Sequence, residues 1–166
     1  MAVDRSIIGK PTSAVRATVE RGPIAKFAAA LGNDDPVYSN ADAARAAGCG
    51  NVPAPPTFTF ALPYWATAAE DQPPDPTDGE NPMHAVMGEL FGQGALVLHG
   101  EQGFTYHRPV EVGMVLDGRG VVRDVYEKET DAATMTFVVV ETEWTEAATG
   151  DPVVTETFNL IARLPK

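Results

Sequence analysis

Two different spacings of apolar residues run along this chain, and the change between them separates a helical first part from a strand-rich second part. Residues 14–20 alternate between polar and apolar side chains, which predicts a short strand. Gly22-Pro23 then opens a helix, because proline suits a first helical turn. The apolar face of this helix recurs at helical spacing, in Ile24, Phe27, Ala28 and Leu31. Gly32 is placed to end the helix.

A second short helix is predicted over residues 41–47. Ser39 or Asn40 would cap its start, and Gly48 would stop it. Residues 52–57 then form a loop that its prolines stiffen. The first third of the chain is therefore expected to contain one strand and two helices.

A strongly apolar segment covers residues 57–69. Most of it predicts a buried helix, and Pro63 either kinks this helix or marks where it starts afresh. A strand over residues 57–62 is the alternative, since Thr-Phe-Thr-Phe alternates. The next segment, residues 70–84, is polar and rich in proline and glycine. It predicts a long, flexible surface loop, either a flap over a pocket or simply a disordered segment.

The rest of the chain predicts an antiparallel meander. Its strand candidates are residues 96–108, 115–128, 133–145 and 153–164, with a turn at residues 147–151. The third of these strands has two distinct faces: Met135, Phe137 and Val139 on one, and Thr136, Val138, Val140 and Trp144 on the other. Helices followed by a meander predict an α+β fold, a single domain over residues 1–166 with helices on one face of the sheet.

Composition narrows the classes of function. The chain has 166 residues, of which 44% are hydrophobic, and this suits one domain with a real core. Its net charge of −11 argues against a nucleic-acid or anionic-membrane partner, since both need a basic surface. No apolar run approaches the roughly 20 residues of a membrane helix, and residues 1–10 contain no signal-peptide core. The single Cys49 fits a cytoplasmic location, and without zinc-type spacing we expect neither a metal nor a cofactor.

Four segments, in order along nearly the whole chain, carry a resemblance to a known family. They are Gly32 to Tyr38 (GNDDPVY), Val52 to Phe58 (VPAPPTF), His99 to Val110 (HGEQGFTYHRPV) and the closing strand at 155–163. The ordered set resembles the MaoC-like dehydratase superfamily, and more closely its FAS1-like branch. That resemblance implies a hotdog fold, in which an antiparallel sheet wraps around a long central apolar helix.

The resemblance also implies a reaction: reversible addition of water to a 2-enoyl thioester of CoA or acyl-carrier protein in fatty-acid metabolism. In the family, an Asp and a His hold the water and supply base and acid. Backbone N–H groups at the start of the central helix stabilise the developing enolate oxygen. Here these groups would belong to Thr57 and Phe58, after Pro56, while Phe60 and Tyr64 would line an acyl tunnel. Plain core packing is the alternative for the aromatic residues.

This chain departs from the family at both catalytic positions. Asn33 stands where the family has its Asp, and an amide cannot act as a base. Tyr38 stands where the family has its His, and a phenol is a poor base at neutral pH. We therefore predict a non-catalytic subunit that helps to bind 3-hydroxyacyl or 2-enoyl thioesters and pairs with a hotdog chain carrying the intact motif. A dimer is expected because one hotdog leaves a sheet edge unpaired.

Two other functions stay open. The first is a homodimeric dehydratase, hydratase or thioesterase with a non-standard site, in which Asp34 or Asp35 is the base and His99 the acid. The second is a protein that binds an acyl thioester without chemistry. A purely structural role is the competing interpretation of Asp34 and Asp35, because an Asn-Asp-Asp-Pro run suits a loop whose side chains bond to nearby backbone.

The first long strand candidate, residues 96–108, contains three polar residues that could lie on one face. His99 and Glu101 are two apart, so they are predicted to share one face, and His107 joins them if the strand stays regular. Such a set is expected to form a solvated or interface face of the strand. It does not suffice for a metal site.

Overall fold

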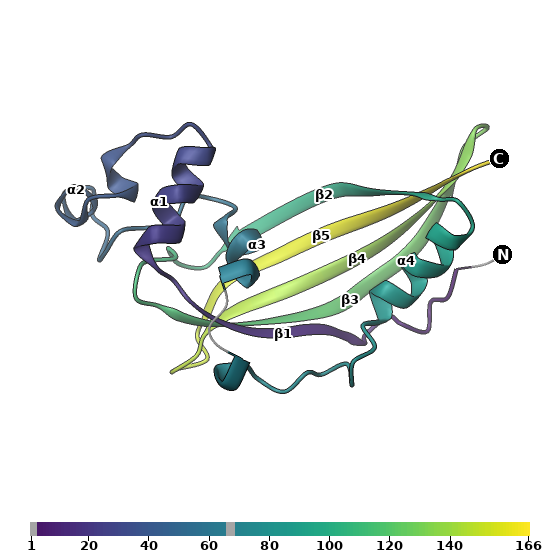
Figure 1. The fold of residues 1–166 in the computed structure, drawn as a ribbon, viewed down its shortest axis with the longest axis horizontal. Helices are drawn as coiled ribbons and strands as arrows, with labels where there is room; N and C mark the ends of the chain where they lie inside the picture. The colour runs from purple at the N-terminus through teal and green to yellow at the C-terminus, as the bar shows by residue number, and fades with distance from the viewer. Residues whose placement is uncertain (1–2, 66–68) are drawn as a thin grey trace.

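Five strands form one antiparallel sheet in the computed structural model, which describes residues 3–65 and 69–166 (Figure 1). The strands are β1 (Pro11–Thr18), β2 (Leu96–Tyr106), β3 (Val115–Glu129), β4 (Ala133–Glu146) and β5 (Pro152–Pro165). Their order across the sheet is β1-β3-β4-β5-β2, so β1 and β2 are its edges. The four predicted strands are confirmed with small shifts at their ends, and the α+β class with them. The meander prediction is wrong for β2, which pairs with β5, so that among the described strands only β3, β4 and β5 are successive neighbours.

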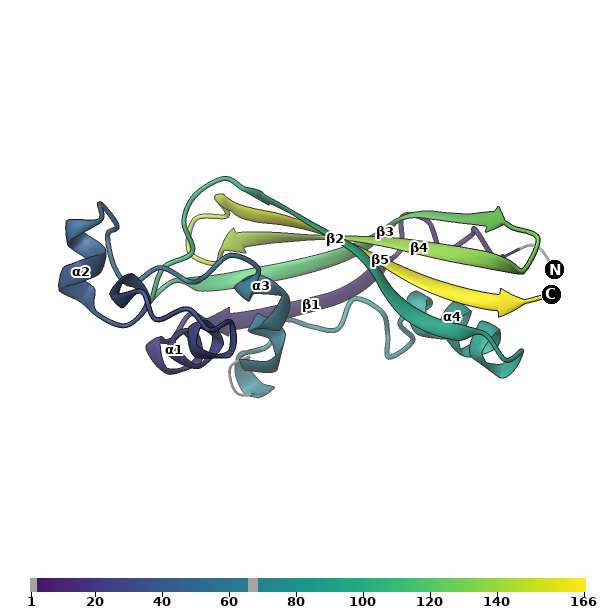
Figure 2. The same cartoon turned by 90° about the horizontal axis from the view of Figure 1, so that it is seen from above.

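The two faces of β4 separate as its alternation predicts. Thr136, Val138, Val140 and Trp144 are buried on the face that the helices cover. Phe137 lies on the opposite face, where its ring stacks on Tyr126 with centroids 4.7 Å apart. Figure 2 shows why only one face is buried: α1, α3 and α4 all lie on the same side of the sheet.

The first two helices lie beyond one end of the sheet, together with a 3₁₀ turn between them (Figure 1). They are α1 (Arg21–Ala30) and α2 (Ala41–Ala46), and the turn is η1 (Pro36–Tyr38). Asn40, and not Ser39, caps α2, because its side chain accepts hydrogen bonds from two backbone N–H groups at the start of that helix. Both predicted helices are confirmed.

The apolar face of α1 is buried only in part. Ile24 and Ala28 are buried against the core, and Phe27 packs against it. Leu31, in contrast, is 56% exposed, because it lies just past the last helical residue. Gly32 follows with φ of 68°, a left-handed conformation that glycine adopts without steric cost and that ends the helix as predicted.

The predicted apolar helix is much shorter than expected. It begins at Phe58, which excludes the alternative strand, and runs as α3 (Phe58–Ala61) for one turn before it tightens into the 3₁₀ segment η2 (Leu62–Trp65). Proline has no backbone N–H, so Pro63 cannot continue the α-helical hydrogen bonds. The burial prediction is wrong for the second half, since Tyr64 is 84% exposed. Residues 66–68 of the predicted helix lie outside the described residues.

A longer helix, α4 (Pro82–Gly92), covers the other half of the sheet and has no counterpart in the predicted elements. Its start overlaps the predicted loop at 70–84, which also contains part of the turn η3 (Ala69–Asp71). Asn81 caps α4 by accepting a hydrogen bond from Met83 N–H. The sheet thus wraps around two short helical pieces, α3 with η2 and α4, and not around one long central helix. The Asn81-Pro82 pair is a sequence signal of a helix start that could have predicted α4.

The segment between η3 and α4 is hydrogen-bonded to the edge strand β1. The Gln72 side chain accepts from the N–H of Arg16 and donates to its carbonyl oxygen, each at 2.9 Å. Asn81 Nδ2 donates to the carbonyl oxygen of Thr12 at 2.7 Å. These bonds satisfy β1 backbone groups on the side that no strand covers.

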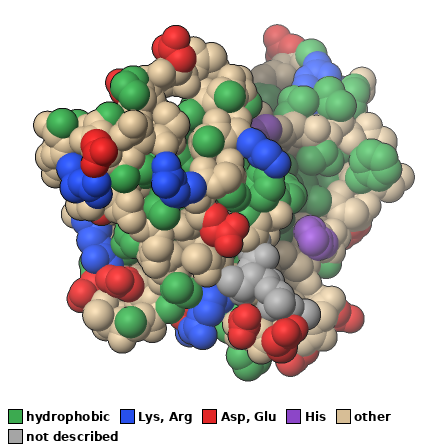
Figure 3. All heavy atoms as spheres, turned by 60° about the vertical axis from the view of Figure 1, so that its left-hand side comes forward, with side chains coloured by type: hydrophobic (Ala, Val, Ile, Leu, Met, Phe, Trp, Pro, Cys, Tyr) green, Lys and Arg blue, Asp and Glu red, His purple; other side chains and the backbone are tan. Residues whose placement is uncertain are grey.

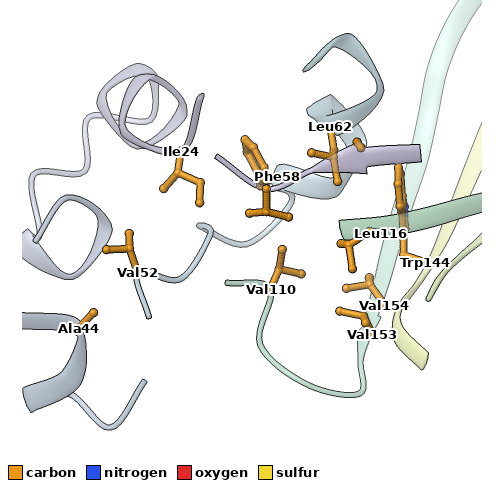
Figure 4. Close-up of a cluster of buried hydrophobic side chains, with 12 residues drawn as sticks. Ile24, Ala44, Val52, Phe58, Leu62, Val110, Leu116, Trp144, Val153 and Val154 are labelled. Carbon is orange, nitrogen blue, oxygen red and sulfur yellow. The ribbon is translucent and has the colours of Figure 1, made fainter. Parts of the chain in front are cut away.

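Two hydrophobic clusters lie along the sheet, one under each helical piece. Figure 4 shows the first, in which Phe58 and Leu62 from α3 and η2 meet Leu116, Trp144 and Val154 from the sheet. The second cluster joins α4 to the other end of the sheet through the buried side chains Val86, Met87, Val122, Val125, Val138 and Ala162. The start of α3 is therefore anchored in the first cluster.

Candidate functional site

A pocket of about 450 Å³ opens beside the start of α3. We call it the α3 pocket; it is lined by residues 54–56, by Phe58 and Thr59, and by residues 106–110 at the end of β2. Its volume is within the range of small-molecule sites. Pro56 and Phe58, two of the five predicted substrate-binding residues, line it directly. Its position follows from the fold, because the proline-rich loop and the end of β2 meet over the first hydrophobic cluster.

Thr57 adjoins this pocket in an unusual backbone conformation. Its φ of 72° is left-handed, which is rare for a β-branched residue and persists only where the surroundings hold it. Its amide N–H donates to the hydroxyl oxygen of Tyr106 at 2.9 Å. The Phe58 N–H donates to the carbonyl oxygen of Pro55 at 3.2 Å. Both amides predicted to stabilise an enolate oxygen therefore already have acceptors within the protein.

The other two predicted substrate-binding residues lie away from the α3 pocket. Phe60 packs against the rings of His99 and Phe158, with centroid distances of 5.4 Å and 5.6 Å. Tyr64 points largely into solvent. The structure thus places Pro56, Thr57 and Phe58 together and separates Phe60 and Tyr64 from them.

The two degenerate catalytic positions line a second pocket of about 440 Å³, which we call the loop pocket. It is formed by α1 and by the loop from Gly32 to Ser39, and it shares no lining residue with the α3 pocket. Asn33 Oδ1 accepts from the N–H of Asp35 at 3.0 Å, and Asp35 Oδ1 accepts from the N–H of Val37 at 2.9 Å. Asn33 and Asp35 are therefore occupied with holding their own loop.

The residues of the alternative catalytic set do not share a pocket. Asp34 and Asp35 line the loop pocket, with Tyr38 half-buried against the first cluster. His99 lies on β2, where its ring is 4.6 Å from that of Phe158. A base and an acid for one water must both come within hydrogen-bond reach of it. This arrangement offers no such meeting point within the chain.

A β-bulge in β2 overturns the prediction that His99 and Glu101 share a face. His99 pairs with Leu160 and Gln102 with Phe158, so β2 has one more residue than β5 over this stretch. His99 packs toward α3, whereas Glu101 accepts a hydrogen bond from Asn159 at 3.2 Å. Side chains no longer alternate regularly between the two faces of a sheet where a strand contains an extra residue.

His107 sits at the end of β2 and lines the α3 pocket, where its Nε2 is 2.9 Å from Thr155 Oγ1. The bulge also separates it from His99, which packs on the rings of Phe60 and Phe158. Within residues 3–65 and 69–166, no group of three His, Cys, Asp or Glu side chains is placed to hold a metal ion.

Glu156 is a buried carboxylate that the sequence analysis missed. It is only 6% exposed and lies on β5 beneath α3. Its Oε2 accepts from Thr59 Oγ1 at 3.0 Å and from Trp144 Nε1 at 3.4 Å, and its Oε1 accepts from Gln102 Nε2 at 3.2 Å. The signal was available, because Glu156 has the same parity as the inward-facing Ala162 of the same strand.

Burial controls the electrostatics of Glu156. Removal from water raises the pKa of this carboxyl above its ordinary value of 4.5, because the charged form loses solvation. Hydrogen bonds from Thr59, Trp144 and Gln102 favour the charged form and oppose this rise. Glu156 does not line the α3 pocket itself, but Thr59 does, so the carboxylate ties the pocket wall to β4 and β2.

Arg108 contributes the cationic group of the α3 pocket. It forms an ion pair with Glu146, which neutralises its charge locally. Its Nε is buried and has no hydrogen-bond partner among the residues that the structure describes. A buried N–H without a partner is costly and normally explained by a bound water or ligand. Arg108 thus carries one buried N–H for which the described residues supply no acceptor.

Exposed apolar side chains gather along the edge strand β2. Leu96 is 57% exposed and Leu98 is 39% exposed, and Phe91 and Phe60 are exposed on the neighbouring helical segments. Figure 3 shows hydrophobic side chains gathered beside two histidines on one hollowed part of the surface. Exposed apolar patches of this kind mark contact surfaces. No helix among the described residues is long and apolar enough to cross a membrane.

Comparison with known proteins identifies the family of the chain. The family described as FAS1-like, dehydratase domain region, matches residues 6–156. A protein of Streptomyces avermitilis, named only UPF0336 protein, is 35% identical over 166 residues, which cover 98% of this chain and 97% of that protein. The match thus extends over nearly the whole of both sequences.

Two solved structures share the fold. A chain of the ChsH1-ChsH2 complex from Mycobacterium tuberculosis matches with a TM-score of 0.71 and 22% identity, over 94% of this chain and 85% of that one. A chain of the HadBC (3R-hydroxyacyl-ACP dehydratase) complex from the same organism matches with a TM-score of 0.66 and 23% identity, over 94% and 97%. The chain therefore belongs to the FAS1-like dehydratase family, and its α+β hotdog fold is that of the MaoC-like dehydratases.

Proposed function

We propose that this protein binds 3-hydroxyacyl or 2-enoyl thioesters of CoA or acyl-carrier protein in its α3 pocket, as the non-catalytic subunit of a dehydratase or hydratase of fatty-acid metabolism. The observation that carries the proposal is the separation of the two pockets. The α3 pocket keeps an apolar wall and one hydroxyl donor, on Tyr106, that has no acceptor among the described residues. The catalytic positions, Asn33 and Tyr38, line a different pocket and cannot supply the family's base and acid.

The chemistry of the α3 pocket supports an acyl ligand. Pro55, Pro56, Phe58 and Val110 offer apolar surface for a hydrocarbon chain. The end of β2 adds polar groups that can orient one oxygen atom. A thioester combines these two requirements, since it carries one carbonyl oxygen next to an alkyl chain.

The edge strand β2 supports a second hotdog chain as partner. Its outer side is unpaired, and an apolar sheet edge is prone to pairing unless another chain covers it. Both similar structures are complexes of two different proteins, as their names state. We propose that the partner carries the intact Asp and His and that the pair works in the cytoplasm. The alternative is a homodimer, in which a second copy of this chain covers the edge strand β2.

The test is reconstitution. The full chain is co-expressed with a hotdog chain that has the intact Asp/His motif, and the mixture is analysed by size-exclusion chromatography and by hydration of crotonyl-CoA. We expect one complex that contains both chains and hydrates the substrate, with activity lost when the partner's His is replaced by Ala. Retention of acyl-CoA without turnover, even in the complex, would support a binding protein without chemistry.

An assay of the purified chain alone addresses the catalytic alternative with Asp35 and His99. Loss of the complex when Leu98 is replaced by Asp, with the fold intact, would support β2 as the contact surface. A complex that forms equally well with Leu98→Asp would argue against it, because a charge on an apolar contact surface costs binding free energy.

A further inference from the structure

We propose that the hydroxyl group of Tyr106 is the donor that binds the carbonyl oxygen of the thioester in the α3 pocket, and this inference rests on the proposed function. Tyr106 ends β2, lines the pocket and is 47% exposed. It was not among the substrate-binding residues predicted from the sequence. Three observations lead to it: an occupied amide, a spare proton and a neutral pocket wall.

The first observation is that Tyr106 stands between the Thr57 amide and the pocket. The amide N–H donates to the Tyr106 hydroxyl oxygen at 2.9 Å. A ligand oxygen therefore cannot bind this N–H while the tyrosine is in place. Thr57 makes this bond from a left-handed backbone conformation, which persists only where its surroundings hold it.

The second observation is that the same hydroxyl has a proton to give. A phenol can accept one hydrogen bond and donate another. The Tyr106 oxygen accepts from Thr57, and no acceptor for its O–H occurs within residues 3–65 and 69–166. The ring itself is held in place by stacking on Phe104, with centroids 6.0 Å apart and planes 13° apart. A fixed ring with an accepted hydrogen bond gives a donor of defined direction.

The third observation concerns charge. Arg108 is the cation that lines this pocket, and it is already paired with Glu146. A carboxylate ligand would therefore find no unpaired cation there. A neutral carbonyl oxygen needs only a neutral donor, and the Tyr106 O–H provides one. The pocket wall thus favours a thioester over a free fatty acid.

This assignment gives Tyr106 a binding role without a catalytic one. The family's enolate-stabilising amides act directly on the substrate oxygen, as the resemblance implies. Here the tyrosine replaces that contact with its own hydroxyl, which holds the ground-state carbonyl. The pocket can then keep its affinity for thioesters although the acid–base pair is gone.

The experiment compares two ligands and two proteins by isothermal titration calorimetry on the full chain. The ligands are decanoyl-CoA and S-decyl-CoA, a thioether of equal chain length that lacks the carbonyl oxygen. Tyr106→Phe keeps the ring and its stacking but removes the hydroxyl. We expect it to weaken decanoyl-CoA about 3- to 10-fold and to leave S-decyl-CoA within about twofold, as for the loss of one hydrogen bond. Tyr126→Phe, whose ring stacks on Phe137 on the opposite face of the sheet, is the control and changes neither.

Each other outcome overturns a defined part of the account. Equal weakening of both ligands means that Tyr106 only shapes the pocket. Tighter decanoyl-CoA binding by Tyr106→Phe means that the Thr57 N–H binds the carbonyl and the tyrosine blocks it. Wild-type protein that binds neither ligand overturns the proposed function itself. If Tyr106→Phe fails to fold, the wild type still decides: without a preference for decanoyl-CoA over S-decyl-CoA, the assignment is wrong.

Discussion

The two pockets are nearly equal in volume, yet they use their polar groups in opposite ways. In the loop pocket, the side-chain oxygens of Asn33 and Asp35 accept hydrogen bonds from backbone N–H groups of the same loop. In the α3 pocket, the Tyr106 O–H has a hydrogen bond left to make. A site that binds a ligand needs groups left free for it. The comparison supports the proposal that the α3 pocket binds the ligand and that the loop from Gly32 to Tyr38 has a structural role.

The two pockets also differ in what supports them. The wall of the α3 pocket includes Phe58 and Val110, which are both buried in the first hydrophobic cluster. The loop pocket is formed largely by exposed loop residues. Substitutions at the α3 pocket should therefore affect folding more strongly than those at the loop pocket.

The largest expected effect is that of Phe58→Ala. This ring is 1% exposed and packs edge-to-face on Phe27, so its loss leaves a cavity. We expect the free energy of unfolding to fall by about 3–5 kcal/mol, measured by urea denaturation. The matched control is Leu31→Ala, on an exposed side chain near the loop pocket, with an expected change of at most about 0.5 kcal/mol. Equal losses would show that the two pockets do not differ in their support.

The next effect concerns the buried carboxylate under α3. Glu156→Leu removes the acceptor for the Trp144 and Thr59 donors, and we expect a loss of about 1–3 kcal/mol in unfolding free energy. Glu156→Gln keeps an acceptor oxygen and should cost clearly less. If both variants lose the same stability, the hydrogen bonds of Glu156 do not hold the pocket wall.

The raised pKa of Glu156 predicts the direction in which the stability of the protein changes with pH. The pKa of Glu156 is raised in the folded protein, so the folded state binds this proton more tightly than the unfolded state. Its contribution to stability is therefore fully present below the ordinary value of 4.5 and is lost as pH rises through the raised pKa. Unfolding free energies measured across this window should show a downward slope for the wild type that Glu156→Gln lessens. An unchanged slope would mean that Glu156 does not titrate there.

A smaller effect is expected at the loop pocket. Asp35→Ala removes the side chain that caps η1, which should cost about 1 kcal/mol, measured by thermal unfolding. Asp34→Ala, on the exposed neighbour, should cost less than about 0.5 kcal/mol. Neither should change the affinity for decanoyl-CoA. A loss of affinity in both would place the ligand in the loop pocket.

The smallest effect is expected where the family's chemistry is restored in part. Asn33→Asp combined with Tyr38→His rebuilds the acid–base pair, but the Thr57 and Phe58 amides keep their internal acceptors. One missing oxyanion donor alone costs about 10²- to 10³-fold in rate. We therefore expect crotonyl-CoA hydration by this double variant to stay near background. A rate far above background would show that the amides are available and that only the acid–base pair was missing.

Patterning predicted the strands well, because the sheet is covered on one side only and its alternation is clear. The same patterning failed where the chain departs from a regular strand or helix. The bulge between His99 and Gln102 turns Glu101 away from His99, and a bulge depends on the pairing strand, which no single segment specifies. Pro63 ended α3 early, although its effect was foreseeable as a kink. Val86 and Met87 of α4 follow a recognisable Asn-Pro start that was hidden in a segment interpreted as loop.

The residues of the candidate site likewise divide into those that could be predicted from the sequence and those that could not. Pro56, Thr57 and Phe58 could be predicted, because the resemblance fixed their place at the start of α3. Tyr106 and Arg108 could not, because they lie about fifty residues further along the chain and reach the pocket only through the pairing of β2 with β5. Glu156 stood in an alternating strand at an inward position. A charged residue at such a position is a signal in its own right.

The most direct test of the central claim is hydration of crotonyl-CoA by the purified wild-type chain alone. The account predicts a rate equal to the uncatalysed background, because Asn33 and Tyr38 cannot supply the base and the acid, and Asp35 and His99 lie in different places. Turnover well above background that Asp35→Asn and His99→Ala each remove would contradict it, and the chain would then be an enzyme in its own right.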